Sequence, residues 1–284
     1  MGSRTTLSRT LGLILTDLSN PFFGNVAAAA EEAARKANFG VLVCDSGEDF
    51  RRERAQIEKL RELGVDGLAL AAAGPDFEHL LELKDEGYPF VLLDRRVEEL
   101  DCDWVAVENV AASRRLCEEL VRHGAARIAF ASGPISAATA RERLEGYRAA
   151  LRGRHIPFET ALVHRGDFGE QCGREAAERF LQLPKAPDAI YCANNRIFAG
   201  CLDRLSPAPK VPWAHLPIAC FDEPPFLAYL GRPVVFAAQP ERALGRRTAE
   251  LLIERVLSGP PGSFRMRKPF IHEMLDVEQK SSGF

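Results

Sequence analysis

Several polar and aromatic side chains of this chain stand just after short apolar runs, where predicted strands end. In the first half, Phe22 and Phe23 follow one such run, and Asp94 and Arg95 follow another. Carboxylates and guanidinium groups pair with adjacent hydroxyls, and an aromatic ring covers the apolar C–H face of a sugar. These residue types therefore predict a binding site for a polyhydroxylated small molecule.

The second half of the chain carries a matching set of candidates for the same site. They are Arg143, Phe168, Asn194, Asp222 and Gln239. The guanidinium groups of Arg95 and Arg143 suit a carboxylate or a phosphate as well as a pair of hydroxyls. A pentose or a hexose is favoured as the ligand, and a sugar acid or a phosphosugar stays open.

Several candidates also have a purely structural interpretation, which the residue pattern leaves open. The two adjacent phenylalanines are equally well explained as core residues at a helix start. Asn194 can cap a helix, and Asp222 can serve a turn with the prolines that follow it. Asp94 and Arg95 can form a solvated pair in a loop. An Asp directly after a strand of an α/β sheet is still a better candidate than average, because ligands bind at the carboxyl ends of the strands.

Strands and helices alternate along the chain, which predicts parallel sheets with helices on both faces. The strands expected in the first part are Leu11–Leu15, Val41–Cys44, Gly67–Ala71, Phe90–Leu93, Val105–Val107 and Arg127–Ala131. The helices expected between them are Phe22–Ala37, Phe50–Leu63, Phe77–Glu86 and Asn109–Arg122. In the second of these helices Ile57, Leu60 and Leu63 fall at helical spacing.

The same alternation starts again after Gly133, so we expect two similar α/β subdomains. The helices expected there are Ala137–Leu151, Gly169–Leu181, Asn195–Leu205 and Glu241–Leu257, and the strands are Ala161–His164, Ala189–Cys192, Leu216–Phe221, Val234–Ala237 and Phe270–Leu275. We assign an N-terminal subdomain to residues 11–133 and 240–262, and a C-terminal one to residues 134–239 and 263–278. Residues 1–10 are interpreted as a linker remnant or tag, and residues 279–284 as a disordered tail. The expected architecture is two Rossmann-like parallel-sheet subdomains with a ligand cleft between them.

The composition is typical of a soluble globular protein, with 46% hydrophobic and 27% charged residues among 284. A net charge of −3 argues against a nucleic-acid-binding surface in this segment, and no apolar stretch is long enough to cross a membrane. Seven cysteines without CxxC spacing indicate free thiols and a cytoplasmic location. No pattern is typical of a metal site, a cofactor site or a nucleophile–base pair, so we do not expect an enzyme.

A series of motifs covers roughly residues 10 to 257 in order and spacing. They are Leu-Gly-Leu-Ile-Leu-x-Asp-Leu-Ser-Asn-Pro-Phe-Phe at 11–23, Val-Asp-Gly-Leu at 65–68, Val-Leu-Leu-Asp-Arg at 91–95, Ala-Arg-Glu-Arg-Leu-Glu-Gly-Tyr at 140–147, Ala-Asn-Asn at 193–195, Cys-Phe-Asp-Glu at 220–223, Gln-Pro at 239–240 and Leu-Gly-Arg-Arg-Thr-Ala-Glu-Leu-Leu at 244–252. Together they resemble the effector-binding core of the LacI/GalR family of bacterial transcription regulators. The family's fold, periplasmic binding protein-like type I, is shared with periplasmic sugar-binding proteins. One departure is Asn195, where the family usually has Asp.

The resemblance implies ligand-contacting positions for Phe22, Phe23, Asp94, Arg143, Phe168, Asn194, Asp222 and Gln239. It also implies a cytoplasmic, homodimeric repressor that binds a small-molecule effector, a sugar or a sugar derivative. In this family, closure of the cleft on the effector alters the binding of operator DNA by an attached helix-turn-helix domain. The first expected strand begins at Leu11, so we expect a core whose DNA-binding domain is missing from this chain. The alternative is an extracytoplasmic sugar-binding protein of a transport system, against which the unpaired cysteines argue.

Overall fold

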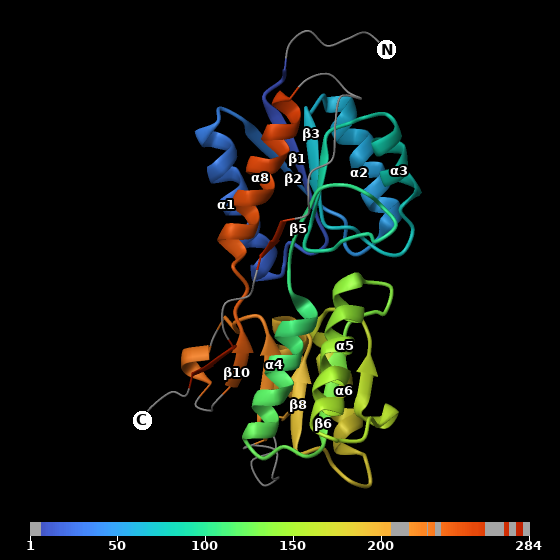
Figure 1. Cartoon of the computed structure of the whole chain (residues 1–284), viewed down its shortest axis with the longest axis vertical. Coiled ribbons are helices and arrows are strands. Elements are labelled where there is room, and N and C mark those ends of the chain that lie inside the picture. Colours follow the sequence, from blue (N-terminus) through green and yellow to red (C-terminus); the bar gives the residue numbers. More distant parts are fainter. Residues whose placement is uncertain are drawn as a thin grey trace. The chain divides into compact units, whose positions relative to one another are not determined.

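The computed structural model describes residues 7–205, 216–225, 227–230 and 234–258, together with two strands at 270–272 and 277–280. The chain divides into two compact units, one formed by residues 1–107 and 240–272 and the other by residues 108–239 and 273–284. Each unit contains one sheet flanked by helices (Figure 1). Among the described residues, no helix has the length and apolarity needed to cross a membrane.

The first unit is built on a parallel sheet of six strands in the order β11-β5-β4-β3-β1-β2. The strands are β1 (Thr10–Leu15), β2 (Gly40–Asp45), β3 (Gly67–Leu70), β4 (Phe90–Leu93), β5 (Trp104–Val107) and β11 (Phe270–His272). The helices are α1 (Pro21–Lys36), α2 (Phe50–Leu63), α3 (Glu78–Asp85) and α8 (Glu241–Leu257). Helices α1 and α8 pack together on one side of the sheet, and α2 and α3 lie on the other (Figure 1).

Local sequence signals explain where these elements begin and end. Asn20 caps α1, because its side-chain oxygen accepts a hydrogen bond from the Phe22 N–H, and Pro21 suits the first helical position. Helix α2 ends at Gly64, whose φ of 81° is in the left-handed region that glycine adopts without strain. Gly245 of α8 lies so close to α1 that a Cβ atom would meet the Val26 carbonyl oxygen, so the pair can pack only with glycine there.

The second unit repeats this plan with the strand order β12-β10-β9-β8-β6-β7, in which only β12 is antiparallel. The strands are β6 (Ile128–Ser132), β7 (Val163–Arg165), β8 (Ala189–Cys192), β9 (Ile218–Phe221), β10 (Val234–Ala237) and β12 (Val277–Lys280). The helices are α4 (Asn109–Arg122), α5 (Ala138–Gly153), α6 (Glu170–Leu181) and α7 (Asn195–Leu205). Short 3-10 turns lie at Thr160–Leu162 and Leu227–Tyr229. The expected fold class, two α/β subdomains on parallel sheets, is confirmed.

The first boundary between the units differs from the expectation, because it follows Val107 rather than Gly133. Helix α4 packs against α5, and its Ser113 hydroxyl lies 2.7 Å from the Tyr191 hydroxyl of β8. Helix α4 and strand β6 therefore belong to the second unit. The alternation of strands and helices runs through residue 107 without a change in composition, so the sequence pattern contains no signal for this crossing.

Three assignments at the chain ends also need correction. Strand β11 pairs with β5 of the first unit, although residues 263–278 were assigned to the C-terminal subdomain. Gln279 and Lys280 pair with β10 in β12, so the expected disordered tail is wrong for these two residues; residues 281–284 lie outside the described part. Within the expected linker remnant, the backbone N–H groups of Ser8 and Arg9 donate to the Asp66 carboxylate, so these residues are part of the fold.

Candidate functional site

Phe22 and Phe23 lie at the junction of β1 and α1. Their side chains are 3% and 4% exposed, and their rings meet edge to face with centroids 4.9 Å apart. The same junction contains Thr16, which is fully buried and whose hydroxyl has no hydrogen-bond partner among the described residues. The packing accounts for both rings as core residues at a helix start, and their ligand role stays a prediction.

Asp94 follows β4 directly and is held in an unusual backbone conformation. Its φ is 64°, which is uncommon for a residue other than glycine and is tolerated best by Asp and Asn. Its N–H donates to the Val105 carbonyl oxygen at 2.8 Å, and its side chain is 6% exposed. The turn therefore places a carboxylate at the carboxyl edge of the sheet, as the sequence pattern predicted.

The guanidinium group of Arg95 is engaged by Glu48. Its Nη1 and Nη2 atoms donate to the two carboxylate oxygens at 2.5 and 2.6 Å, and Nη1 also lies 3.4 Å from the Ala72 carbonyl oxygen. Burial alone lowers the pKa of Arg95, but the adjacent Glu48 charge and hydrogen bonds outweigh it and raise the pKa above its ordinary value. Arg95 is thus a buried cation with a protein carboxylate as its partner.

A second buried pair beside this one was missed by the sequence analysis. Glu53 is fully buried and accepts hydrogen bonds from the Ala73 N–H at 2.8 Å and from His79, whose Nε2 lies 2.7 Å from Glu53 Oε1. These contacts fix the chain just after β3, next to the carbonyl that Arg95 approaches. A signal was present: Glu53 precedes Ile57 by four residues, which places it on the buried face of α2.

Arg143 of α5 is the central cation of the second unit. It is 4% exposed, donates from Nε to Asn109 Oδ1 at 2.9 Å and from Nη1 to the Ala193 carbonyl oxygen at 2.6 Å. Its guanidinium carbon lies 3.7 Å from the centroid of the Phe221 ring, a cation–π contact. The nearby Arg141 instead donates to backbone carbonyls on the surface. Of these two arginines, only Arg143 reaches the strand ends.

Asp222 and Gln239 follow the neighbouring strands β9 and β10 and bond to each other. Gln239 Nε2 donates to Asp222 Oδ1 at 2.6 Å, and the Asn195 N–H donates to Asp222 Oδ2 at 3.3 Å. Asp222 is 2% exposed and has a φ of 87°. The Gln239 Oε1 atom is buried and accepts no hydrogen bond from the described residues, which leaves one acceptor available.

Asn194 caps α7 and also joins two loops. Its Oδ1 accepts from the Ile197 N–H at 2.8 Å, and its Nδ2 donates to the Phe168 carbonyl oxygen at 2.9 Å. The Phe168 ring lies against Gly133, where a Cβ atom would meet it at 2.3 Å. The structural interpretation of Asn194 as a cap is therefore correct, and the residue also positions a second candidate.

Within each unit, the structure brings the predicted residues to the carboxyl edge of the sheet. In the second unit Arg143, Asn194, Asp222 and Gln239 are linked through shared or adjacent residues at the ends of β8, β9 and β10. Carboxylate, amide and guanidinium groups held rigidly in this way suit the recognition of hydroxyl groups. The described residues contain no group of three or more His, Cys, Asp or Glu side chains able to hold a metal ion.

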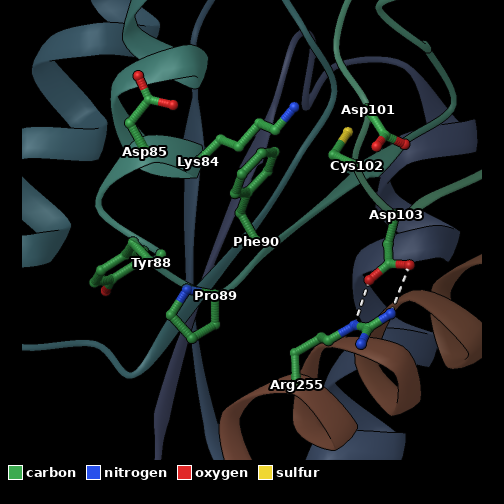
Figure 2. A pocket seen from close by; sticks show the side chains of 10 residues that line it. Lys84, Asp85, Tyr88, Pro89, Phe90, Asp101, Cys102, Asp103 and Arg255 are labelled. Atoms are coloured by element: carbon green, nitrogen blue, oxygen red, sulfur yellow. Dashed lines mark hydrogen bonds and ion pairs between the residues drawn. The ribbon is translucent and has the colours of Figure 1, made fainter. Parts of the chain in front are cut away.

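A cavity of about 390 Å³ lies elsewhere, at the amino ends of β4 and β5 (Figure 2). Figure 2 shows Arg255 pointing toward Asp103, and Arg255 Nη2 donates to Asp103 Oδ1 at 2.8 Å. Tyr88, Phe90 and Cys102 form part of the lining, and none of the predicted site residues does. The buried charges of Asp103 and Arg255 pair with each other in this lining.

Comparison with known proteins relates the whole arrangement to one family. Residues 8–259 match the family described as periplasmic binding proteins and sugar binding domain of LacI family. The chain is 28% identical over 257 residues to the HTH-type transcriptional repressor CytR of Escherichia coli K12, covering 90% of this chain and 75% of the relative. It is 26% identical over 252 residues to the HTH-type transcriptional repressor PurR of Vibrio atlanticus, covering 88% and 75%.

A solved structure agrees with this relationship. The Cra transcriptional dual regulator of Pseudomonas putida, in complex with fructose 1-phosphate, superposes with a TM-score of 0.84 at 26% identity, covering 98% of this chain and 100% of that one. The fold is therefore the periplasmic binding protein type I fold, and the relatives are transcriptional regulators rather than enzymes. The chain belongs to the LacI family of transcriptional regulators and corresponds to the effector-binding domain of these proteins.

Proposed function

We propose that this domain binds a polyhydroxylated small molecule, a sugar or a sugar derivative, as the effector of a LacI-type repressor. The observation that carries the proposal is the network of Arg143, Asn194, Asp222 and Gln239 at the carboxyl edge of the second sheet. These groups are held in place by the protein before any ligand arrives, which lowers the entropic cost of binding. The available Gln239 Oε1 acceptor suits a ligand hydroxyl.

The nine predicted residues form one proposed effector site that takes contacts from both units. They are Phe22, Phe23, Asp94, Arg95, Arg143, Phe168, Asn194, Asp222 and Gln239. An effector that contacts both units favours the closed state by its differential affinity for that state. In the proposed repressor, this change in population alters the affinity of an attached helix-turn-helix domain for operator DNA. The proposed location is the cytoplasm. This location is supported by the seven cysteines, which are all free.

We propose further that the domain forms a homodimer through the outer faces of both units, with the β2 edge of the first unit as part of the interface. Strand β2 is an edge strand, and its Leu42 and Val43 side chains are 40% and 41% exposed. Exposed apolar residues on a sheet edge are costly in a monomer and typical of an interface. This edge supports the dimer that the family resemblance implies.

A thermal-shift screen over sugars, sugar acids, phosphosugars and nucleosides tests the effector proposal. A ligand at 100 times its dissociation constant stabilises the folded state by about 2.7 kcal/mol, which raises the melting temperature measurably. The same mixtures, analysed for products, check that the ligand is returned unchanged. A screen in which no polyhydroxylated compound raises the melting temperature, or in which one is consumed, contradicts the proposal.

A further inference from the structure

The charges of three carboxylates in the first unit act on Arg95. Arg95 is buried, and the three carboxylates are those of Glu48, Asp94 and Glu53. Glu48 contacts it bidentately, and Asp94 Oδ2 lies 3.7 Å from its Nε atom. An anion that approaches Arg95 therefore meets the carboxylates of Glu48 and Asp94 beside it.

Glu48 reaches Arg95 from a different part of the sheet. It lies in the loop after β2, whereas Arg95 follows β4, and strands β3 and β1 lie between those two in the sheet. The loop is well fixed: the Ser46 N–H donates to the Leu15 carbonyl oxygen at 2.8 Å, and Asp49 caps α2 through the Arg51 N–H. Glu48 itself has a φ of 60°. A phosphate on Arg95 has to displace this carboxylate and break two short, charge-assisted hydrogen bonds.

In the second unit, two nitrogens of the predicted Arg143 are already engaged by the protein. Two donors of Arg143 are used by Asn109 and the Ala193 carbonyl, and one face of its guanidinium group lies on Phe221. Bidentate recognition of a phosphate or carboxylate needs two parallel N–H donors of one arginine. Both Nη atoms of Arg95 and the Nε and Nη1 atoms of Arg143 already have protein partners, so an anion competes with those partners at either arginine.

We propose that the effector is an uncharged polyhydroxylated molecule, and that Glu48 sets this specificity by neutralising Arg95 and repelling phosphorylated or carboxylated analogues. The inference rests on the proposed function and narrows its ligand class. It separates this chain from the relative that is complexed with fructose 1-phosphate. Because a phosphate placed beside Glu48 and Asp94 is repelled by both carboxylates, binding of a phosphorylated analogue is weakened by about 100-fold.

Matched pairs of probes test the inference by calorimetry and by thermal shift: D-fructose with fructose 1-phosphate, D-ribose with ribose 5-phosphate, and inorganic phosphate alone. The neutral member is expected to bind the wild type about 100-fold more tightly than its phosphate. Glu48→Gln removes the charge and keeps an acceptor for Arg95, so it should strengthen binding of the phosphorylated member and of inorganic phosphate by about tenfold, as expected for one lost like-charge contact. Glu48→Asp, which keeps the charge, should behave like the wild type.

Glu98→Gln is the matched control, because Glu98 forms an exposed ion pair with Arg96 at 3.1 Å in the same segment. It should change none of these affinities. Circular dichroism checks the fold of each variant, and Glu48→Ala serves as the second charge-removing variant if Glu48→Gln does not fold. Equal phosphate binding by the wild type and the charge-removing variant overturns the inference, as does tighter binding of a phosphosugar than of its parent sugar to the wild type. If no sugar binds any variant, the proposed function fails, while the inorganic phosphate measurement still decides the role of Glu48.

Discussion

Asp94 and Asp222 occupy equivalent positions in the two sheets. Each sheet contains five parallel strands in the same arrangement, β5-β4-β3-β1-β2 and β10-β9-β8-β6-β7. Asp94 follows β4 and Asp222 follows β9, the second strand in each order, and both residues have a left-handed backbone. The N–H of Asp94 donates to Val105 and that of Asp222 to Ala237, in both cases on the neighbouring strand. Both residues thus have the same backbone strain at the same topological position, and both carboxylates lie at a carboxyl edge. This combination is typical of a binding site rather than of a random turn.

Substitution of Asp222 should separate binding from folding. Asn tolerates a φ of 87°, and its single amide oxygen still accepts from one of the two donors, Gln239 Nε2 or the Asn195 N–H. Asp222→Asn should therefore fold but bind the effector about tenfold more weakly, since a ligand hydroxyl no longer meets a charged acceptor. Asp222→Ala loses both hydrogen bonds and should lower the free energy of unfolding by about 1–3 kcal/mol. Urea unfolding and calorimetry measure the two effects. Equal stability of the Ala and Asn variants would contradict the argument.

Arg143 should be sensitive even to a conservative change. Arg143→Lys keeps the charge but loses the fork that joins Asn109 to the Ala193 carbonyl, and most of the contact with Phe221. We expect the effector no longer to raise the melting temperature of this variant. Without effector, a loss of about 1 kcal/mol in the free energy of unfolding should lower the melting temperature by a few degrees. Arg152→Lys, on the exposed end of the same helix, is the control. A full thermal shift in Arg143→Lys would remove Arg143 from the site.

The proposed dimer can be tested at the β2 edge. Val43→Glu places a charge on an exposed apolar position of this strand and should convert the dimer into a monomer, because burying an unpaired carboxylate in an interface is costly. Leu63→Glu is the control, because Leu63 is 60% exposed at the end of α2 in the same unit. Sedimentation or light scattering gives the mass. A wild-type monomer, or a dimeric Val43→Glu variant, would disprove the interface.

The buried pair of Asp103 and Arg255 beside the cavity of Figure 2 should be important for stability. Arg255→Met leaves a buried carboxylate without its partner, and we expect it to lower the free energy of unfolding by about 3–5 kcal/mol. The double variant Asp103→Leu/Arg255→Met removes both charges and should regain a large part of this loss. Chemical unfolding of the three proteins measures the coupling. A double variant that is no more stable than Arg255→Met would show that the unpaired Asp103 carboxylate does not destabilise the fold.

Buried thiols should make the protein sensitive to alkaline pH. Burial raises the pKa of Cys102 and of Cys172 from 9.0 to about 12. The folded state therefore keeps protons that the unfolded chain releases, so stability is intact below pH 9 and falls as the pH rises from 9 toward 12. The free energy of unfolding, measured across this range, should fall less steeply in Cys102→Ala. An identical slope in the variant and the wild type would contradict the assignment.

The order and type of the elements could be predicted from the sequence with good accuracy. Strands β4, β8 and β10 and helices α2, α4, α7 and α8 match the expected ranges residue for residue, and β5 begins one residue earlier than expected. Hydrophobic periodicity and capping are local properties, so the chain itself contains these signals. The placement of the candidate residues could also be predicted from the sequence, since a side chain that directly follows a parallel strand must lie at the carboxyl edge of the sheet. The crossing after Val107 was missed because it depends on the packing of α4 against α5, which no local pattern records.

The amino-acid sequence by itself determined the fold class, the family and the set of residues at the strand ends. Only the tertiary structure decided the electrostatic character of the candidate site in the first unit. Arg95 and Glu48 are 47 positions apart and follow different strands, so nothing in their sequence neighbourhoods indicates that they meet. Their contact reverses the expectation for a lone arginine, because a cation with a bidentate carboxylate partner no longer attracts a second anion.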